Sequence, residues 1–399
     1  MINSTTSSRE SCLFSAESVA AGHPDKLADQ ISDAIVDAFL QREPRARVAC
    51  ETLVADGYIV LAGEFRTAAE AVFHQVRDGA PRTVRDLLRE VGYTDRASGI
   101  DVAACEIVVR FNHQSADIAQ GVDRTDREQG AGDQGTMFGY ATRETDALMP
   151  KPIWLAHRLM QRQGELRRHG ALPWMRPDGK TQVTVRYRHG VPAEVVTVVL
   201  STQHAPDVSP DRLRDDVIRH IIEPVIPEAE RAADIRYLIN PTGRFEIGGP
   251  LGDTGLTGRK NIVDTYGGSC PHGGGALSGK DPSKVDRSAA YMARYIAKNV
   301  VAARLAERCM VQLAYSIGLA EPVSLLVDTH GTGAVSDAVL EATVPAVFPL
   351  TPRGIIDALN LLRPIYRATA VYGHFGREEE GFAWERTDRV DSLLRALGR

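Results

Sequence analysis

The sequence has few cysteines and no long hydrophobic run. No apolar stretch reaches the ~18 residues that a membrane-spanning helix needs, and residues 1–10 are polar and Ser/Thr-rich, without the apolar segment of a secretion signal. The five cysteines show no C-x-x-C spacing, which argues against a zinc site and a disulfide framework. We expect a cytoplasmic protein with reduced thiols, no membrane partner and a short disordered tail at residues 1–10.

An excess of positive charge is also missing. The chain of 399 residues has 47 Lys and Arg against 52 Asp and Glu, a formal net charge of −5. Nucleic-acid-binding proteins usually carry an extended basic surface. We therefore expect no nucleic-acid partner, and any anion site must be local. The length and the 43% hydrophobic content are ordinary for a globular chain of two or three domains.

Hydrophobic periodicity predicts helices that alternate with pairs of strands. Helices are expected at 24–40, 69–91, 153–169, 211–222, 283–304 and 352–361. Strands are expected at 48–54, 58–65, 103–111, 181–187, 193–201, 235–239, 310–317 and 323–328. This pattern is typical of α/β modules of the mixed, α+β type. It predicts an N-terminal unit at 12–111, a central unit at 124–240 and a C-terminal unit at 241–399, with a long polar and potentially mobile functional loop at 112–135.

The glycine-rich segment 272–287 is the most informative part of the chain. Glycines let the backbone approach an anion closely, and a following helix N-terminus adds free N–H groups and partial positive charge. Lys280 and Lys284 would share one helical face if the helix already includes Lys280. Asp281 and Asp286 could hold a divalent ion. Together these features predict a site for a polyphosphate carried with Mg²⁺.

The same segment departs from a P-loop. Residues 274–280 fit G-x-x-x-x-G-K, but Asp281 stands where a P-loop has Ser or Thr, and no hydrophobic strand precedes it. We interpret the segment as a phosphate loop of another kind. A plain glycine-rich surface turn before a helix is the alternative.

A second candidate lies at the start of the first helix, where His23 and Asp25 follow a glycine. In a functional interpretation His23 donates to an anion and Asp25 binds the metal attached to it. The alternative is structural: an Asp in a first turn favours the helix dipole, and Asp25, Asp29 and Asp33 at i, i+4 spacing form a solvated acidic face.

Three further glycine-containing segments are notable. Residues 130–135 spell G-x-G-x-x-G, but no strand precedes them, so a dinucleotide-binding turn is disfavoured and Asp133 remains as a carboxylate in an open turn. Residues 177–181 carry a turn signature, whose plain interpretation is an exposed hairpin loop. Residues 248–260 hold five glycines around one Asp and end in two cations, and the upstream Arg244-Phe245 pair could stack on a base.

Taken together, these segments resemble the S-adenosylmethionine synthetases (methionine adenosyltransferases). The resemblance extends from about Phe14 to Asp388 and is carried by five motifs. They are G-H-P-D-K at 22–26, G-A-G-D-Q-G at 130–135, G-G-P-x-G-D at 248–253, G-L-T-G-R-K at 255–260, and H-G-G-G-A-x-S-G-K-D-P-S-K-V-D-R-S at 272–288.

The resemblance implies three similar α/β domains around a pseudo-threefold axis. It implies a homodimer with active sites at the subunit interface, often doubled into a dimer of dimers (a homotetramer). The implied reaction joins L-methionine to the adenosyl part of ATP by attack of sulfur on C5′. The tripolyphosphate is then hydrolysed to pyrophosphate and phosphate.

The resemblance also assigns roles to individual residues. The implied ATP contacts are His23, Asp178, Lys180, Arg244, Phe245, Asp253, Arg259, Lys260, Ala276 and Lys280. The implied methionine contacts are Glu64, Gln114, Asp253 and Lys284. The implied metal sites are Asp25 and Asp286 for two Mg²⁺ per site and Glu51 for K⁺. The implied catalytic residues are His23, Asp133, Lys180 and Lys280.

The implied chemistry agrees with the residue types. A neutral methionine sulfur needs no general base, which fits the absence of a Ser–His or Cys–His pairing. A departing tripolyphosphate needs cations and a histidine where charge accumulates. Two other functions are alternatives: a plain ATP phosphotransferase or tripolyphosphatase, and an inactive regulatory homologue. The joint presence of Glu64, Gln114 and Asp253 argues against the first, and intact cationic and acidic positions argue against the second.

Overall fold

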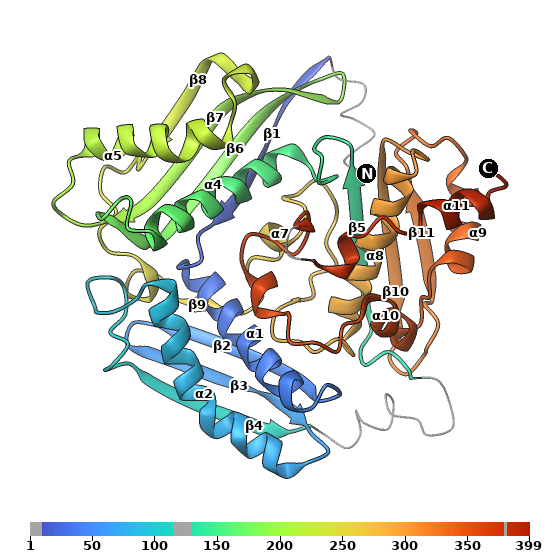
Figure 1. Cartoon of the computed structure of the whole chain (residues 1–399), viewed down its shortest axis with the longest axis horizontal. Coiled ribbons are helices and arrows are strands. Elements are labelled where there is room, and N and C mark those ends of the chain that lie inside the picture. The colour runs from blue at the N-terminus through green and yellow to red at the C-terminus, as the bar shows by residue number, and fades with distance from the viewer. Residues whose placement is uncertain (1–9, 115–128, 379–380) are drawn as a thin grey trace.

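The computed structural model describes residues 10–114, 129–378 and 381–399. Its strands form three sheets, arranged around central helices (Figure 1). The first sheet has the order β4 (Glu106–His113), β3 (Tyr58–Arg66), β2 (Arg47–Ala55) and β9 (Gly255–Leu256). The second has the order β1 (Ser11–Val19), β6 (Met175–Arg188), β7 (Val191–His204) and β8 (Arg231–Ile239). The third has the order β11 (Ser324–Asp328), β10 (Arg308–Tyr315) and β5 (Gly135–Thr142).

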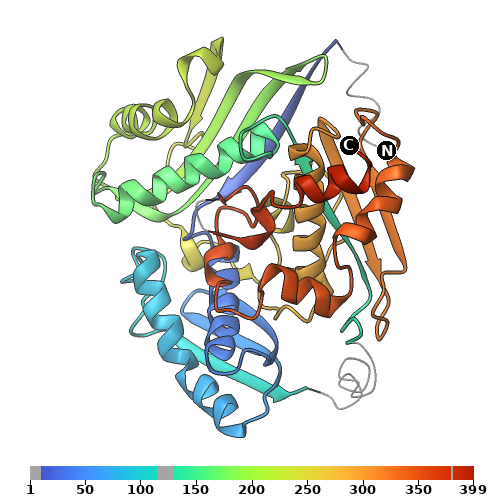
Figure 2. The same ribbon diagram turned by 45° about the vertical axis from the view of Figure 1, so that its right-hand side comes forward.

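Helices pack against these sheets and meet in the middle of the molecule (Figure 2). The long helices are α1 (Pro24–Arg42), α2 (Glu70–Val91), α4 (Lys151–Arg168) and α8 (Val285–Ala302). The shorter helices are α5 (Pro210–Val217), α6 (Glu223–Val225), α7 (Asn261–Asp264), α9 (Asp337–Val347), α10 (Pro352–Leu359) and α11 (Val390–Ala396). A π-turn at Ile218–Ile222 joins α5 to α6. The mixed α/β class predicted from the sequence is confirmed.

Each sheet combines strands from two of the three sequence segments. The first segment contributes β1 to the second sheet, where Val19 pairs with Lys180. The second segment contributes β5 to the third sheet, and the third contributes β9 to the first. The exchange is therefore cyclic. As a result, the residues that follow each exchanged strand lie beside a neighbouring unit. This placement matters for the candidate site.

The predicted strands and helices each overlap an observed element, but β1, β5, β9, α6, α7, α9 and α11 were not predicted. Strand β5 contains Gly139, and a glycine weakens the pattern expected of a strand. A Cβ on Gly139 would lie 2.0 Å from the carbonyl carbon of Ala293. The glycine thus lets α8 lie directly against this strand. The predicted tail (residues 1–9) and much of the predicted loop (115–128) fall outside the described residues.

Helix α8 begins later than expected. Its first residue is Val285, so Lys280 lies outside the helix and does not share a helical face with Lys284. The side chain of Asp281 accepts the N–H of Ser283, and Pro282 disfavours a helical conformation at the residue before it. Its apolar side chains, among them Val285, Ala289, Met292, Ile296 and Val300, are buried, and the helix also buries charged side chains.

A row of carboxylates along α1 ties three loop segments to this helix. Asp25 accepts the N–H of Leu256 (3.0 Å) and Asp29 that of Gly258 (2.8 Å). Asp33 accepts the N–H of Gly279 (2.9 Å). One turn further, Asp37 accepts the N–H groups of Tyr366 and Arg367, both at 2.9 Å. The first three carboxylates are at most 2% exposed, so the alternative of a solvated acidic face is wrong.

Two buried cations share this row. Arg287 of α8 donates to both carboxylate oxygens of Asp33, at 2.7 and 2.9 Å. Lys26 donates to Asp29 (2.8 Å) and to Asp264. Burying charges in this way is tolerable only when each has its partner, because an uncompensated buried charge is strongly destabilising. The pairs therefore hold α1 against α8 through Arg287 and against α7 through Lys26.

Replacing Arg287 tests how strongly the stability of the fold depends on the buried Arg287–Asp33 pair. Arg287→Leu leaves Asp33 buried without its cation, and we expect the free energy of unfolding to fall by about 3–5 kcal/mol. Arg353→Leu is the matched control, because it removes an exposed pair with Asp357 and should change stability by less than about 1 kcal/mol. Urea unfolding followed by circular dichroism measures both. Equal losses in the two variants would contradict the importance of the buried pair.

Candidate active site: two groups of side chains

The first group begins at the N-terminus of α1. His23 caps the helix, and its Nδ1 accepts the N–H of Asp25 at 3.2 Å. Burial, together with nearby Lys180 and Lys260, lowers the pKa of His23 to about 3. The imidazole is therefore neutral, and since Nδ1 is an acceptor its proton is on Nε2. Nε2 is buried and has no partner among the described residues, so one strong donor remains unused.

Asp25 connects this turn to the glycine-rich loop at 248–260. Its carboxylate lies 2.8 Å from Nζ of Lys260 and 3.6 Å from Nε of Arg259. Burial alone would raise the pKa of Asp25, but the hydrogen bonds from Lys260 and the N–H of Leu256 outweigh it and lower that pKa. The carboxylate is thus ionised, and it gathers two cations beside His23.

The start of β6 completes the first group. Asp178 lies within the strand and is 4% exposed, so the alternative of an exposed hairpin loop is wrong. Its Oδ2 accepts the N–H of Gly249 at 2.9 Å, while Oδ1 is buried without a partner. Burial raises the pKa of Asp178 to about 6, against the effect of the Gly249 N–H and Lys180. A Cβ on Gly22 would lie 2.4 Å from the Pro177 carbonyl oxygen, so only glycine lets the His23 turn approach β6.

Arg244, Phe245 and Asp253 lie at the edge of this group. Phe245 exchanges two hydrogen bonds with His204 of β7: its N–H donates to Nε2 and its carbonyl oxygen accepts the His204 N–H, both at 3.0 Å. Its half-buried ring lies over Gly248, where a Cβ would be 2.9 Å from the ring. Arg244 and Asp253 are exposed. The Phe245 ring and the unpaired Oδ1 of Asp178 are thus available to a ligand, beside the two cations that contact Asp25.

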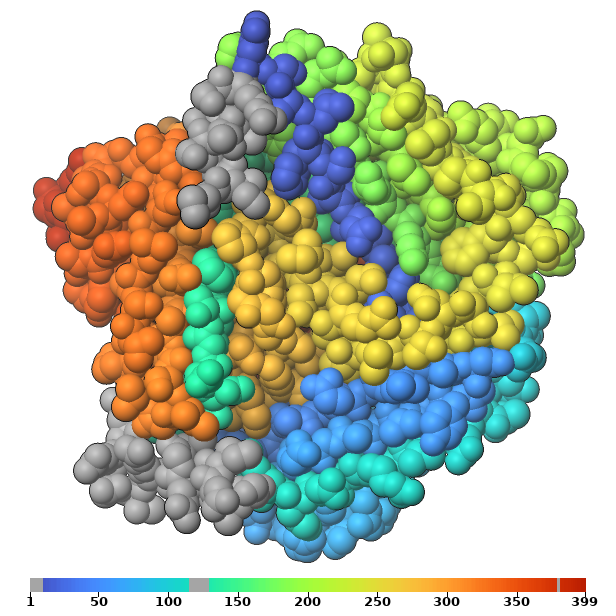
Figure 3. All heavy atoms as spheres, turned by 180° about the vertical axis from the view of Figure 1, so that it is seen from behind, coloured from blue at the N-terminus to red at the C-terminus, as the bar shows by residue number. Residues whose placement is uncertain are grey.

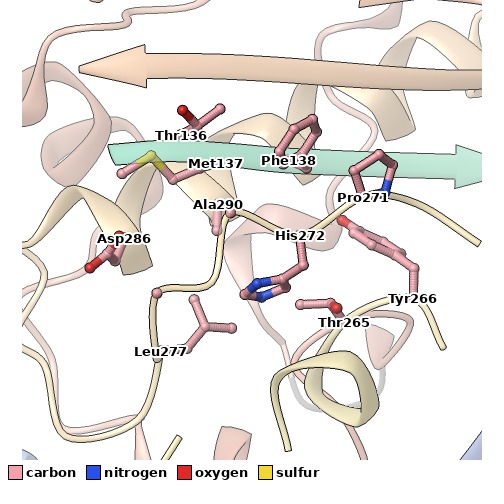
Figure 4. Close-up of a pocket in the computed structure, with 12 residues that line it drawn as sticks. Thr136, Met137, Phe138, Thr265, Tyr266, Pro271, His272, Leu277, Asp286 and Ala290 are labelled. Carbon is pink, nitrogen blue, oxygen red and sulfur yellow. The ribbon is translucent and has the colours of Figure 1, made fainter. Parts of the chain in front are cut away.

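The second group lies on segment 272–286. Nζ of Lys280 is 2.5 Å from Oδ2 of Asp286. Gly275 is required here, because a Cβ would lie 2.4 Å from Oδ1 of Asp286. Asp286 and His272 are among the residues that line a void of about 20 Å³ beside strand β5, enough for a single water (Figure 4). No function was predicted for His272 from the sequence. Its Nδ1 accepts the Gly274 N–H, and burial lowers its pKa.

Residues of the first sheet lie beside this second group, because Lys280 forms a backbone bridge with Ala49 of β2. Glu51 and Glu64 are exposed on β2 and β3. Partial desolvation raises the pKa of Glu51, and the Lys280 charge opposes that rise. Gln114 follows β4 and donates its N–H to the carbonyl of Phe65.

Asp133 and Ala276 are placed by loops. Oδ1 of Asp133 accepts the N–H of Gln134 at 2.8 Å, in the turn before β5. Ala276 meets the first group's loop, since a Cβ on Gly258 would lie 2.5 Å from the Ala276 Cβ. Asn261 also donates to the Gly274 carbonyl across this boundary.

Lys284 and Asp281 belong to neither group. Nζ of Lys284 is 2.5 Å from Oδ2 of Asp281, and that oxygen also accepts the N–H of Val48 at 2.7 Å. Asp281 is 1% exposed. The expectation that Asp281 could hold a divalent ion is wrong, because its oxygens already hold the backbone and Lys284 in place.

No hydrogen bond or ion pair joins a site residue of the first group to one of the second within the described ranges. Nor do the described residues contain a cluster of three or more His, Cys, Asp or Glu that could hold a metal ion alone. Mg²⁺ bound with a nucleotide typically uses one or two carboxylates plus phosphate oxygens and water. The isolated Asp25 and Asp286 fit that pattern better than a metal site made by protein alone. No helix in the described ranges has the length and apolarity to cross a membrane.

Comparison with known families covers almost the whole sequence. Residues 11–116, 128–245 and 247–386 match the N-terminal, central and C-terminal domains of S-adenosylmethionine synthetase. The chain belongs to the S-adenosylmethionine synthetase family. The resemblance inferred from the five motifs is thereby confirmed, as is the three-domain architecture of the family.

Individual members of the S-adenosylmethionine synthetase family are similar over nearly their full lengths. The S-adenosylmethionine synthase of Helicobacter hepaticus is 57% identical over 385 residues, covering 96% of this chain and 98% of the relative. That of Wolinella succinogenes is 58% identical with the same coverage. That of Nitratiruptor sp. is 59% identical over 381 residues, 96% of this chain and 97% of the relative.

The protonation state of His23 can be tested directly. Its folded pKa (about 3) lies below the unfolded value, so the folded imidazole should stay neutral from pH 8 to 5. Stability should accordingly fall as pH drops below about 6.5, where the unfolded chain takes up a proton that folded His23 does not. ¹⁵N NMR of the imidazole, assigned with His23→Gln, measures the charge. The urea-unfolded chain, titrating near 6.5, is the control, and a folded midpoint above 6 would contradict the prediction.

Proposed function

We propose that the chain is an active S-adenosylmethionine synthetase. It joins the sulfur of L-methionine to C5′ of ATP and then hydrolyses the tripolyphosphate to pyrophosphate and phosphate. The observation that carries this proposal is the neutral His23, whose unused Nε2–H is buried near Lys180 and Lys260. A neutral donor between cations suits a leaving polyphosphate, whose negative charge grows during the reaction.

The other members of the first group support the same reaction. Lys180, Lys260 and Arg259 would stabilise the departing phosphates, and Asp178 and Phe245 would bind the adenosine part. The unpaired Oδ1 of Asp178 is an acceptor that a donor on the base or sugar can satisfy. The sulfur needs no base, so the protein's main contribution is orientation of two substrates, which can supply roughly 7 kcal/mol or more.

Metal ions are part of this proposal. Asp25 and Asp286 would each take a Mg²⁺ bound to the phosphates, and Glu51 would lie beside K⁺. Mg²⁺ would neutralise phosphate charge as it develops. The cations that now pair with these carboxylates, Lys260 and Lys280, can turn to phosphate oxygens once a metal binds. Methionine would contact Glu64, Gln114, Asp253 and Lys284, with Asp133 beside the substrates.

We further propose that two copies associate so that the first group of one faces the second group of the other. Two features support this arrangement. Within the described residues, no hydrogen bond or ion pair joins a site residue of one group to a site residue of the other, and large apolar residues are exposed on strands of all three sheets. They are Leu13, Val191, Leu238, Leu256 and Leu326. The segments that form β1 (dark blue) and β5 (blue-green) reach the surface seen from behind (Figure 3). Pairing into a tetramer, a cytoplasmic location and the absence of nucleic-acid and membrane partners remain predictions.

Product analysis tests the reaction. Purified protein with ATP, methionine, Mg²⁺ and K⁺ should form S-adenosylmethionine, pyrophosphate and phosphate in equal amounts. Formation should depend on methionine. Phosphate release without the sulfonium product would instead indicate a phosphatase, and no turnover would indicate an inactive homologue.

Mixing two inactive variants tests the shared site. His23→Asn damages the first group and Lys280→Met the second, and each should lose at least about 100-fold in kcat. Refolding them together should restore about a quarter of wild-type activity, because half of the dimers are mixed and one of their two sites is intact. Activity no higher than that of the separate variants, in a mixture shown to contain mixed dimers, would place each complete site within one chain.

A further inference from the structure

A second hollow, of about 430 Å³, lies between residues at the ends of helices α2 and α4. The end of α4 meets the end of α2 there (Figures 1 and 2), and segment 364–372 completes the wall. None of the residues assigned to the two groups lines it. Its size falls within the range of small-molecule sites. We refer to it as the helix-side cleft.

The helix-side cleft carries excess positive charge. Arg167 and Arg168 end α4, and within the described ranges neither has a carboxylate partner. Burial lowers the pKa of Arg167, which means that keeping its guanidinium charged at this position costs free energy. The guanidinium lies against the end of α2: a Cβ on Gly92 would be 1.9 Å from its Nη1. Two adjacent arginines without a carboxylate partner among the described residues thus line the cleft.

The other charged residues of the cleft are already paired. Arg367 lies 2.7 Å from Glu90. Asp37 accepts the N–H groups of Tyr366 and Arg367, and burial raises its pKa to about 6. These carboxylates therefore do not neutralise the arginines at the end of α4.

Tyr372 adds a buried hydroxyl to the same wall. It is 8% exposed, and its hydroxyl has no hydrogen bond of ordinary geometry with the described residues. Burial raises the pKa of Tyr372, and Arg168 partly offsets the rise. Gly164 makes room for the ring on α4, since a Cβ there would lie 2.5 Å from the hydroxyl oxygen. The residue has a φ of +61°, which is unfavourable for tyrosine.

We propose that the helix-side cleft binds a small organic anion. Its phosphate or carboxylate group would lie between Arg167 and Arg168 and accept the Tyr372 hydroxyl. Its apolar part would lie against Val91 and Ile365. The proposal does not rest on the enzymatic activity. The site also adjoins the first group: Ala21 lines the cleft, two residues before His23, and its carbonyl accepts Nε2–H of Gln30 at 2.7 Å.

The test uses 8-anilinonaphthalene-1-sulfonate, an aromatic anion that fluoresces in apolar surroundings. The dye should bind one saturable site per chain, and Arg167→Gln with Arg168→Gln should weaken it at least about 10-fold. Arg82→Gln with Arg89→Gln is the matched control. It removes the same charge from exposed pairs with Asp86 on α2 and should leave affinity within about two-fold.

Unchanged affinity in the cleft variant, or an equal loss in the control, would overturn the proposal. Circular dichroism checks that each variant is folded. If the double variant is unfolded, two single variants replace it: Arg168→Gln, which changes an exposed position, and Tyr372→Phe. Each should weaken the dye at least about three-fold, and no change in either would overturn the site. Displacement of the dye by phenyl phosphate but not benzoate identifies a phosphate ligand, and the reverse identifies a carboxylate.

Discussion

The row of aspartates on α1 is the constraint on which the rest of the structure depends. Asp25, Asp29, Asp33 and Asp37 follow one another at i, i+4 spacing, so their side chains line one side of the helix. Each carboxylate accepts a backbone N–H at a different position in the loops around α1. A hydrogen bond to a charged group contributes about 1.5–3 kcal/mol, and a buried carboxylate left without partners is costly. The loops must therefore adopt conformations that bring their N–H groups to α1.

This arrangement explains how glycine-rich loops can form a well-defined site. Asp25 and Asp29 hold loop 255–260, which carries the cations of the first group. Asp33 holds Gly279, one residue before Lys280 of the second group. A single rigid helix thus sets the positions of both groups within the chain. Sites supported by such elements keep the accurate geometry that catalysis by orientation requires.

Local patterns in the sequence were sufficient to predict most helices and strands, the polyphosphate chemistry and the family. Contacts between distant segments were not predictable in this way. No strand was predicted at β5, whose Gly139 weakens a strand pattern but is needed for contact with α8. Asp281 looked like a metal ligand, but it binds the N–H of Val48, far away in the sequence. The aspartate row looked like a solvent-facing surface because its loop partners lie more than 200 residues further along the chain.

Amide hydrogen exchange tests the role of the aspartate row most directly. If the carboxylates hold the loops, the N–H groups of Leu256, Gly258 and Gly279 should exchange at least about 1,000-fold more slowly than unprotected amides, like those inside α1. Site-resolved exchange measured by NMR or mass spectrometry gives these rates. Exchange at the rates of an open loop, while α1 itself stays protected, would show that the loops are not held by the helix.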